Sequence, residues 1–239
     1  MRILSSALAL ALMTTAASAA DLISAGVVEV AMTDEVASWS GCYVGASLGY
    51  AAQTTATVLA AGYYDGGSHV AEGFNVGGRV GCDVQLGEMV LGVVGTIELT
   101  DLSGSNAFYP VGPGFPEYTT TETSAIATIK GRLGYLVDPA LLLYGTGGLA
   151  VIRNRHTDYD TTPVMSFNGS VEDTRVGYVV GLGAEYAVAD GWSVFAEYNY
   201  VDFGQKDLTL VDGVIYPGNW VNRYDNTAHA FAVGLNFRF

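Results

Sequence analysis

The last nine residues of the chain alternate one apolar side chain with one small or polar side chain and end on an aromatic residue. Because successive side chains of a β-strand point to opposite faces, one face carries Phe231, Val233, Leu235, Phe237 and Phe239. The other face carries Ala232, Gly234, Asn236 and Arg238. In a soluble sheet the apolar face would be buried, whereas in a membrane-spanning barrel it faces lipid and the polar face lines the lumen.

The first residues have the pattern of a secretory signal peptide. Met1 and Arg2 precede an apolar stretch from Ile3 to Met13, and Ala17-Ser18-Ala19 is a small-x-small cleavage pattern. The apolar stretch is shorter than the roughly 20 residues that a spanning helix needs. We therefore expect residues 1–19 to be removed on export. No later segment has an uninterrupted apolar run of that length, so a mature chain that enters a membrane must do so as a closed barrel.

Seven further segments show the same alternation, at positions 41–50, 74–86, 89–99, 124–135, 141–151, 176–186 and 192–200. Three of their connections are tight turns, near Gly87, Asp138-Pro139 and Asp190-Gly191. The others are long, over 51–73, 101–122, 152–173 and 204–225. An even number of strands joined alternately by short and long connections is typical of bacterial outer-membrane barrels.

The alternation predicts an all-β chain that forms an eight-stranded antiparallel up-and-down transmembrane β-barrel, with short periplasmic turns and four long extracellular loops. The barrel domain covers residues 41–239, and residues 20–40 form a periplasmic linker. Both termini then lie in the periplasm of a Gram-negative cell. A lipocalin-like soluble barrel is the rival fold, and it fails because lipocalins line their cavity with the apolar face and keep charges outside.

Charged residues favour the same orientation. Those on the proposed inner faces are Arg79, Lys130, Arg132, Arg238, Asp83, Glu98, Glu185 and Glu197. Reversing the faces would cost about 2–4 kcal/mol for each Arg or Lys at mid-membrane. Because side chains roughly fill an eight-stranded lumen, charges buried there must pair. We predict a lumen-plugging ion-pair network of Arg79, Glu98, Lys130, Arg132, Glu185 and Glu197. Hydration of several of these charges near the rims is the alternative.

Aromatic residues cluster at both ends of the predicted strands. Tyr50, Phe74, Tyr200 and Phe203 fall at the outer ends, and Tyr135, Tyr186, Trp192 and Phe239 fall at the periplasmic ends. Amphipathic rings suit the interfaces between membrane and water. These two sets are therefore predicted to form two aromatic girdles.

Six segments resemble the small outer-membrane β-barrel proteins of alphaproteobacteria, the OmpA-like porin family that includes major surface antigens and haemin-binding proteins. They are GCYVGASLGY (41–50), GGRVGCDVQLGEMVLGVVGTIELTDLSGS (77–105), KGRLGYLV (130–137), YGTGGLAV (144–151), GWSVFAEYNYVDFG (191–204) and VGLNFRF (233–239). The resemblance implies an eight-stranded barrel among outer-membrane lipids and lipopolysaccharide. It also implies that the C-terminal signal, Phe237 and Phe239, is read by the barrel-assembly machinery.

Cys42 and Cys82 depart from this resemblance, because aromatic or aliphatic residues are expected at their positions. Both lie on the outward parity of adjacent antiparallel strands, and pairing Tyr50 with Phe74 places them opposite each other. Opposed residues of an antiparallel ladder have Cα atoms about 4.5–5.5 Å apart, within the range of a disulfide. We predict a cross-strand disulfide near the periplasmic rim. Two separate lipid-facing thiols are the alternative.

The residues that remain bear on several classes of function. The formal net charge of −14 makes the chain a poor nucleic-acid binder. The histidines, His69, His156 and His229, form no catalytic constellation or metal site with their sequence neighbours. A lipid-A-modifying enzyme would need His229 to approach Glu197 or Asp202 across neighbouring strands.

The resemblance suggests haemin as a loop ligand, with His69, His156 and Tyr159 as axial or stacking groups. Packing of these loop aromatics into a cap is the alternative. A wide diffusion pore is disfavoured because porins have about twice as many strands, although a narrow ion channel stays open. The sequence favours a non-enzymatic envelope protein with a structural and surface-exposed role, a plugged lumen and no required cofactor.

Overall fold

A computed structural model describes residues 38–59, 64–108, 117–160, 168–211 and 219–239. The predicted signal peptide and most of the predicted linker lie outside these ranges. In the described part of the chain, no helix is long and apolar enough to cross a membrane.

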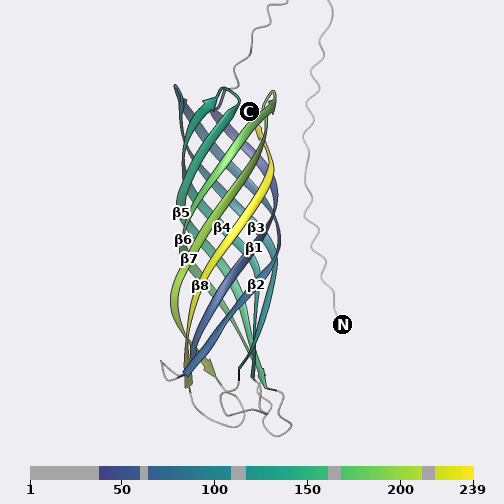
Figure 1. Ribbon diagram of the computed structural model, residues 1–239, viewed down its shortest axis with the longest axis vertical. Coiled ribbons are helices and arrows are strands. Elements are labelled where there is room, and N and C mark those ends of the chain that lie inside the picture. Colours follow the sequence, from purple (N-terminus) through teal and green to yellow (C-terminus); the bar gives the residue numbers. More distant parts are fainter. Residues whose placement is uncertain (1–37, 60–63, 109–116, 161–167, 212–218) are drawn as a thin grey trace, which may run out of the picture. The chain divides into compact units, whose positions relative to one another are not determined.

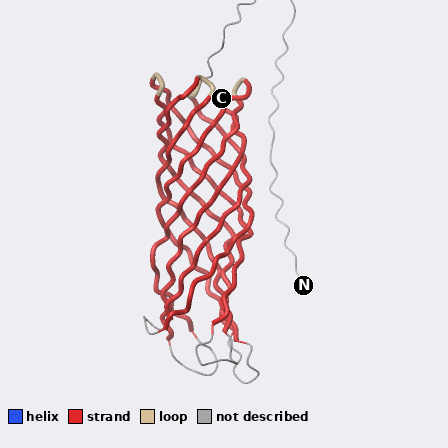
Figure 2. The backbone as a smooth tube through the Cα atoms, viewed as in Figure 1, coloured by secondary structure: helices blue, strands red, loops and turns tan. Residues whose placement is uncertain are grey.

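Eight antiparallel strands close into one barrel, with each strand bonded to the next and β1 bonded to β8 (Figures 1 and 2). The strands are β1 Gly41–Leu59, β2 Tyr64–Leu86, β3 Met89–Phe108, β4 Glu117–Asp138, β5 Leu141–Asp160, β6 Asn168–Ala189, β7 Trp192–Val211 and β8 Asn219–Arg238. The tight turns fall at 87–88, 139–140 and 190–191, where they were predicted. Gly87 and Gly191 take positive φ angles of 66° and 71° there, which glycine adopts without strain. The predicted barrel is confirmed.

The strands continue well into the segments predicted as long loops. Strand β1 runs on to Leu59 and β5 to Asp160, so the connections that remain, 60–63, 109–116, 161–167 and 212–218, are short and lie outside the described residues. Beyond the membrane the outward positions are polar, so the hydropathy signal fades while strand-forming Thr and Val persist. We call this outer part of the barrel, formed by the strand ends beyond about Tyr50, Leu99, Val151 and Val176, the collar.

The outer face of the remaining barrel carries a belt of exposed apolar side chains. Leu48, Phe74 and Leu182 are 65%, 76% and 70% exposed, and the predicted outward positions of all eight strands behave in the same way. A surface of this kind would be unstable in water and is the lipid-facing surface of a membrane barrel.

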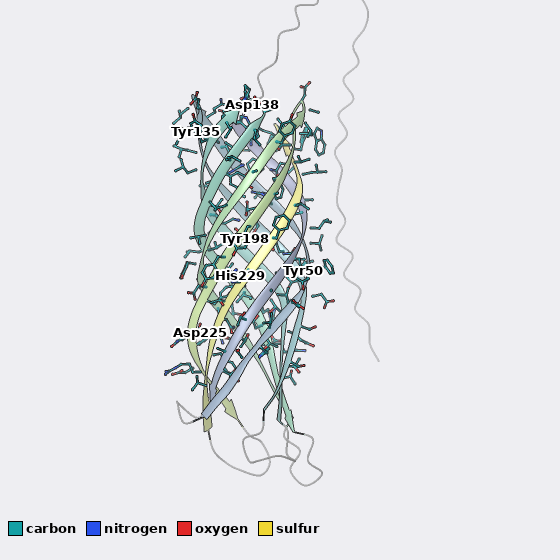
Figure 3. The ribbon with its side chains drawn as sticks, viewed as in Figure 1. Tyr50, Tyr135, Asp138, Tyr198, Asp225 and His229 are labelled. Atoms are coloured by element: carbon teal, nitrogen blue, oxygen red, sulfur yellow. A yellow bond between two sulfur atoms is a disulfide. The ribbon has the colours of Figure 1, made fainter. Side chains whose placement is uncertain are left out.

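Girdle residues border this belt at both ends. Tyr135, Tyr186, Trp192 and Phe239 are exposed at the end with the tight turns, and Tyr50 packs edge-on against Phe74 at the other end with ring centroids 5.5 Å apart. Figure 3 places Tyr135 near the turn end and Tyr50 near the middle of the barrel's length. The prediction for Phe203 is wrong, because this side chain points into the lumen and is 6% exposed. Its odd position on β7 gives it the inward parity of Glu197.

A bulge changes the facing of several residues on β4. The β3–β4 register shifts between Leu99 and Leu102, and the β4–β5 register shifts between Thr123 and Ala125. Ser124, which simple alternation places inside, is exposed, and Thr123, which it places outside, is buried. An extra residue in one strand reverses the parity of those before it.

Inward-facing glycines make room for two tyrosines whose rings lie over the neighbouring strand inside the lumen. A Cβ atom at Gly81 would lie 2.5 Å from the Tyr43 ring, and one at Gly183 would lie 2.4 Å from the Tyr144 ring. Both tyrosines are buried. The glycine pattern of β2 and β6 therefore sets where bulky lumen side chains can lie.

Candidate functional site

The periplasmic half of the lumen contains a first layer of ion pairs centred on Arg132 of β4. Its guanidinium bonds Asp83 Oδ2 of β2 at 2.9 Å, and its other terminal nitrogen bonds Glu185 of β6. The side chains of all three are 0% exposed. Arg238 of β8 also reaches Asp83, at 3.0 Å. Four strands are thus joined through the lumen by two carboxylates and two guanidiniums.

A second layer lies farther from the turns and is centred on Glu197 of β7. This carboxylate pairs with Lys130 of β4 and with Arg79 of β2, the latter at 3.4 Å, and it accepts a hydrogen bond from the Tyr144 hydroxyl at 3.0 Å. Arg79 also lies over the Phe195 ring, 4.1 Å from its centroid. Such a stacked guanidinium is stabilised without further hydrogen bonds to water.

The structure places five of the six predicted lumen residues in these two layers. Glu98 is the exception: among the described residues it forms no ion pair, and its carboxylate accepts a hydrogen bond from Asn75 Nδ2 at 2.8 Å. Asp83 and Arg238 take part in the first layer although the predicted network omitted them. Their inward parity was the signal that could have found them.

An apolar layer follows above the ion pairs. Its buried side chains are Ile126, Ala150, Ile152, Val179, Val201, Phe203 and Ala228, with Ala51, Ala71 and Leu102 beside them. They come from all eight strands and form two neighbouring clusters inside the lumen. A dry apolar constriction of this kind opposes the passage of hydrated ions.

The lumen of the collar is polar and mostly uncharged. Thr123 Oγ1 donates to Gln53 Oε1 at 3.1 Å and lies 2.8 Å from Asn154 Oδ1. Asp173, the cross-strand partner of Asn154, pairs with Arg175 on the same strand and with Lys206 of β7 at 2.5 Å. The polar character of this level is consistent with its position outside the hydrocarbon region.

Trp39 closes the periplasmic opening of the lumen. It is 2% exposed and packs against Val90, Leu142 and Tyr144. Its indole N–H donates to the Pro139 carbonyl at 3.0 Å, and its own carbonyl accepts from Arg238 at 2.7 Å. The end of the predicted linker is therefore part of the barrel, which sequence reasoning missed because one Trp before a strand carries no periodic signal.

Cys42 and Cys82 lie opposite each other on β1 and β2 and are joined by a disulfide, with Cα atoms 4.0 Å apart. They sit on the outer face near the periplasmic end, one residue from Asp83 of the first ion-pair layer. The periplasmic end of the β1–β2 pair is therefore cross-linked by the disulfide on the outer face and joined to β4 and β8 by the ion pairs of Asp83 on the inner face.

Both aromatic residues of the predicted assembly signal lie on the outer face at the end of the chain. Phe237 packs against Trp192 with ring centroids 5.0 Å apart. The backbone N–H of Phe239 donates to the Cys42 carbonyl at 3.0 Å, which joins the last residue to the first strand.

The histidines do not gather into one site in the described structure. His69 lies within β2, not in a loop; its ring is buried inside the collar, and Nε2 is 3.2 Å from Thr121 Oγ1. The backbones of His156 and Tyr159 belong to β5, and their side chains lie outside the described residues. His229 is on the outer face near Tyr198 (Figure 3), and its Nδ1 is 2.7 Å from the Tyr198 hydroxyl, whereas Glu197 points into the lumen. That pair cannot form an acid–base site.

Ion pairs also occur on the outer face of the collar. Glu172 of β6 accepts hydrogen bonds from Arg153 at 2.6 Å and from Arg155 at 3.0 Å, and these bonds hold the pKa of its carboxyl below the ordinary value. Arg223 of β8 donates to Asp207 of β7 at 2.8 Å, which lowers the pKa of Asp207 in the same way. All five side chains are about half exposed.

A closed β-barrel with a lipid-facing apolar belt, two aromatic girdles and a charged, filled lumen is an outer-membrane barrel protein. The chain belongs to the family described as "Outer membrane protein beta-barrel domain", whose pattern matches residues 6–239. It is located in the outer membrane of a Gram-negative bacterium.

Two relatives from Brucella melitensis extend this assignment. The chain is 31% identical to the 31 kDa outer-membrane immunogenic protein over 238 residues, covering 96% of both chains. It is 26% identical to the 25 kDa outer-membrane immunogenic protein over 205 residues, covering 84% of this chain and 80% of the relative. Among solved structures, the outer membrane protein OprG from Pseudomonas aeruginosa aligns with a TM-score of 0.57 at 13% identity, over 85% of this chain and 98% of OprG. This likeness concerns the fold.

Proposed function

We propose that the protein is a non-enzymatic, non-conducting barrel that strengthens the outer membrane and presents its outer connections to the surroundings. The observation that carries this proposal is the filled lumen. Trp39, two ion-pair layers and an apolar layer follow one another along the axis. Each of the charged layers bonds strands that are not neighbours in the wall, as Arg132 does for β2 and β6.

The apolar layer is the main argument against a narrow ion channel. Ion pairs can exchange partners and open a polar path, but Ile126, Ile152 and Val179 offer an ion no ligand. Current through the barrel would need this layer to move as well as the charges.

The collar supports the role in surface presentation. On β5 it extends for about nine residues beyond Val151, or about 20 Å above the membrane at a rise of about 3.3 Å per residue and the usual barrel tilt. The two Brucella relatives are named as immunogenic proteins. A collar of this height would likewise let the surroundings of the cell contact the present chain.

Conductance of the refolded barrel in planar bilayers tests the sealed lumen. The parent protein should give no stable current steps, and Ile152→Ala combined with Phe203→Ala should give them, because these changes remove apolar bulk and leave the ion pairs. Glu98→Gln, a lumen change away from the layer's centre, is the matched control. Stable ohmic steps from the parent protein, in samples whose gel mobility shifts on boiling, would refute the proposal.

Haemin binding through the predicted residues is the alternative function. His69 is enclosed by the collar and already contacts Thr121, which disfavours it as an axial ligand. We expect no Soret shift that depends on His69. A shift in the parent protein that is lost in both His69→Ala and His156→Ala would favour the haemin function instead.

Recognition of the C-terminal strand by the barrel-assembly machinery belongs to the same proposal. Phe237 and Phe239 project from the last strand on its outer face, where an assembly factor could contact them before β8 joins β1. Deletion of Phe239 should reduce insertion in cells while the purified chain still refolds in detergent. Equal reduction in both settings would mean that Phe239 acts on stability alone.

A further inference from the structure

The outer face of the wall is hollowed across strands β3 to β7, midway along the apolar belt. The groove has a volume of about 840 Å³. Leu91, Leu133 and Leu182 line its sides, and Tyr198 borders it at β7 (Figure 3). The floor is bare backbone, because the outward positions at the centre of β4 and β5 are glycines.

The glycines of this floor are not required by packing of the barrel. A Cβ atom would have its nearest neighbour at 3.7 Å at Gly131, 3.8 Å at Gly145 and 4.0 Å at Gly147, which are ordinary contacts. At Gly148, the inward-facing neighbour of Gly147, it would lie 2.0 Å from the Ile129 carbonyl oxygen. Gly148 is thus needed inside the wall, whereas the floor glycines leave space open on the lipid side.

A second pocket lies on the same wall at the edge of the collar. It has a volume of about 360 Å³ and is formed by strands β3 to β6, beside the bulges of β3 and β4. Its outward residues follow the last belt residues directly: Asp101 comes two positions after Leu99, and Arg153 two positions after Val151. The pocket therefore lies at the level of the lipid headgroups.

This pocket carries charges of both signs. Arg153 and Arg155 of β5 share the single carboxylate of Glu172, so one positive charge is in excess there. Asp101 of β3 and Glu122 of β4 line the pocket on the two strands that precede β5. Glu122 is the cross-strand partner of Arg155, and neither carboxylate is in an ion pair with a described residue. A group with a phosphate next to an ammonium matches this arrangement, whereas an anion alone would meet a pocket of net negative charge.

The spacing of the two hollows matches one lipid leaflet. Along β5, six residues separate Gly147 in the groove from Arg153 in the pocket. At about 3.3 Å per residue and a tilt of about 35–45°, this is about 15 Å of depth. Half of a hydrocarbon core of about 30 Å is the same length.

We propose that this wall binds a zwitterionic aminoalkyl-phosphate glycerolipid. Its phosphate lies against Arg153 and Arg155, its ammonium against Asp101 and Glu122, and the end of one acyl chain occupies the groove over Gly131 and Gly147. The site goes beyond the proposed envelope role, since a sealed barrel does not need a specific lipid.

Native mass spectrometry of the refolded, full mature chain tests the site. The probes are phosphatidylethanolamine, phosphatidylglycerol and lipopolysaccharide, each added to detergent micelles. We expect phosphatidylethanolamine to be retained at collision energies that strip phosphatidylglycerol. Gly147→Leu, which fills the groove without a backbone clash, should reduce this retention at least tenfold. Gly78→Leu is the control, because its nearest Cβ neighbour is at 3.9 Å and it lies outside the groove.

Charge variants separate the two halves of the headgroup. Asp101→Asn with Glu122→Gln should abolish the preference over phosphatidylglycerol, and Arg153→Gln with Arg155→Gln should weaken both lipids. The collar variant Asp207→Asn should change neither. Equal retention of both phospholipids by the parent protein, or retention unaffected by Gly147→Leu, would overturn the proposal. So would preferred retention of lipopolysaccharide, or a dimer that Gly147→Leu dissociates. Gel mobility checks that each variant is folded.

Discussion

Two arginine–aspartate pairs of nearly equal geometry lie on opposite faces of the same wall. Arg132 bonds Asp83 inside the lumen at 2.9 Å, with both side chains 0% exposed, and Arg223 bonds Asp207 outside the collar at 2.8 Å, with both about half exposed. The inner pair is removed from water and has no competing solvent, whereas the outer pair is screened. The contribution of an ion pair to the free energy of unfolding is therefore set by its exposure to water, and not by its bond length.

Loss of the inner arginine should produce the largest effect. Arg132→Ala leaves Asp83 without its principal partner and Glu185 without its basic partner, and breaking a buried pair in this way typically costs about 3–5 kcal/mol. The measurement is the urea midpoint of the barrel refolded in detergent, followed by the mobility shift on gels. Arg223→Ala is the matched control and should leave the midpoint almost unchanged. Similar losses for both variants would contradict the comparison.

The disulfide joins the periplasmic ends of β1 and β2 on the outer face of the wall. At the same level, Asp83 of β2 forms its ion pairs on the inner face. The disulfide closes a sequence separation of 40 residues, for which chain-entropy arguments give roughly 4 kcal/mol, with typical measured values of about 2–4 kcal/mol. Replacing both Cys42 and Cys82 by Ala should lower the urea midpoint. A reductant should lower the midpoint of the parent protein and leave the midpoint of this variant unchanged. Two free thiols found by alkylation of the denatured, unreduced chain would show that the cross-link does not form.

Adjacent glycines on β5 compare the two faces without any charge. Gly148→Ala places a Cβ atom 2.0 Å from the Ile129 carbonyl oxygen, so the wall must deform at a cost of roughly 1–3 kcal/mol. Gly147→Ala meets nothing closer than 4.0 Å and should be neutral or stabilising by up to about 1 kcal/mol. The urea midpoints of the two variants measure this difference. Equal destabilisation would mean that replacing glycine in β5 lowers stability whether or not the new Cβ atom meets a neighbour.

The sequence was sufficient to predict the tight turns and the membrane-spanning part of each strand, because an apolar face toward lipid repeats with a strict period of two. It did not predict how far the strands extend beyond the membrane, where the outward positions are polar. Phe203 shows the limit of using residue type in place of parity: the aromatic side chain suggested a girdle, while its odd position on β7 already assigned it to the lumen. Ser124 shows the opposite limit, since a bulge beside it reverses a parity that was read correctly.

The sequence predicted which charged residues point into the lumen better than it predicted which of them bond each other. Parity identifies which charges point inward, but the partner of each depends on the stagger between strands that are not neighbours. Glu98 bonds Asn75 instead of a basic residue, and Arg132 joins Asp83 as well as Glu185. Trp39 could not be found by periodicity, because it precedes the first strand and its burial depends on turns distant in sequence.

The outer pair should produce the smallest effect, and its contribution depends on pH only in the acidic range below the ordinary aspartate pKa. Because the hydrogen bond from Arg223 lowers the pKa of Asp207 below its unfolded value, the pair stabilises the folded state above the ordinary aspartate pKa. This contribution is lost as the pH falls through the lowered pKa. The midpoint difference between the parent protein and Asp207→Asn should therefore be small at neutral pH and vanish in acid. High salt should reduce it at neutral pH, since the pair is exposed. A difference that grows on acidification would show that Asp207 is destabilising when charged.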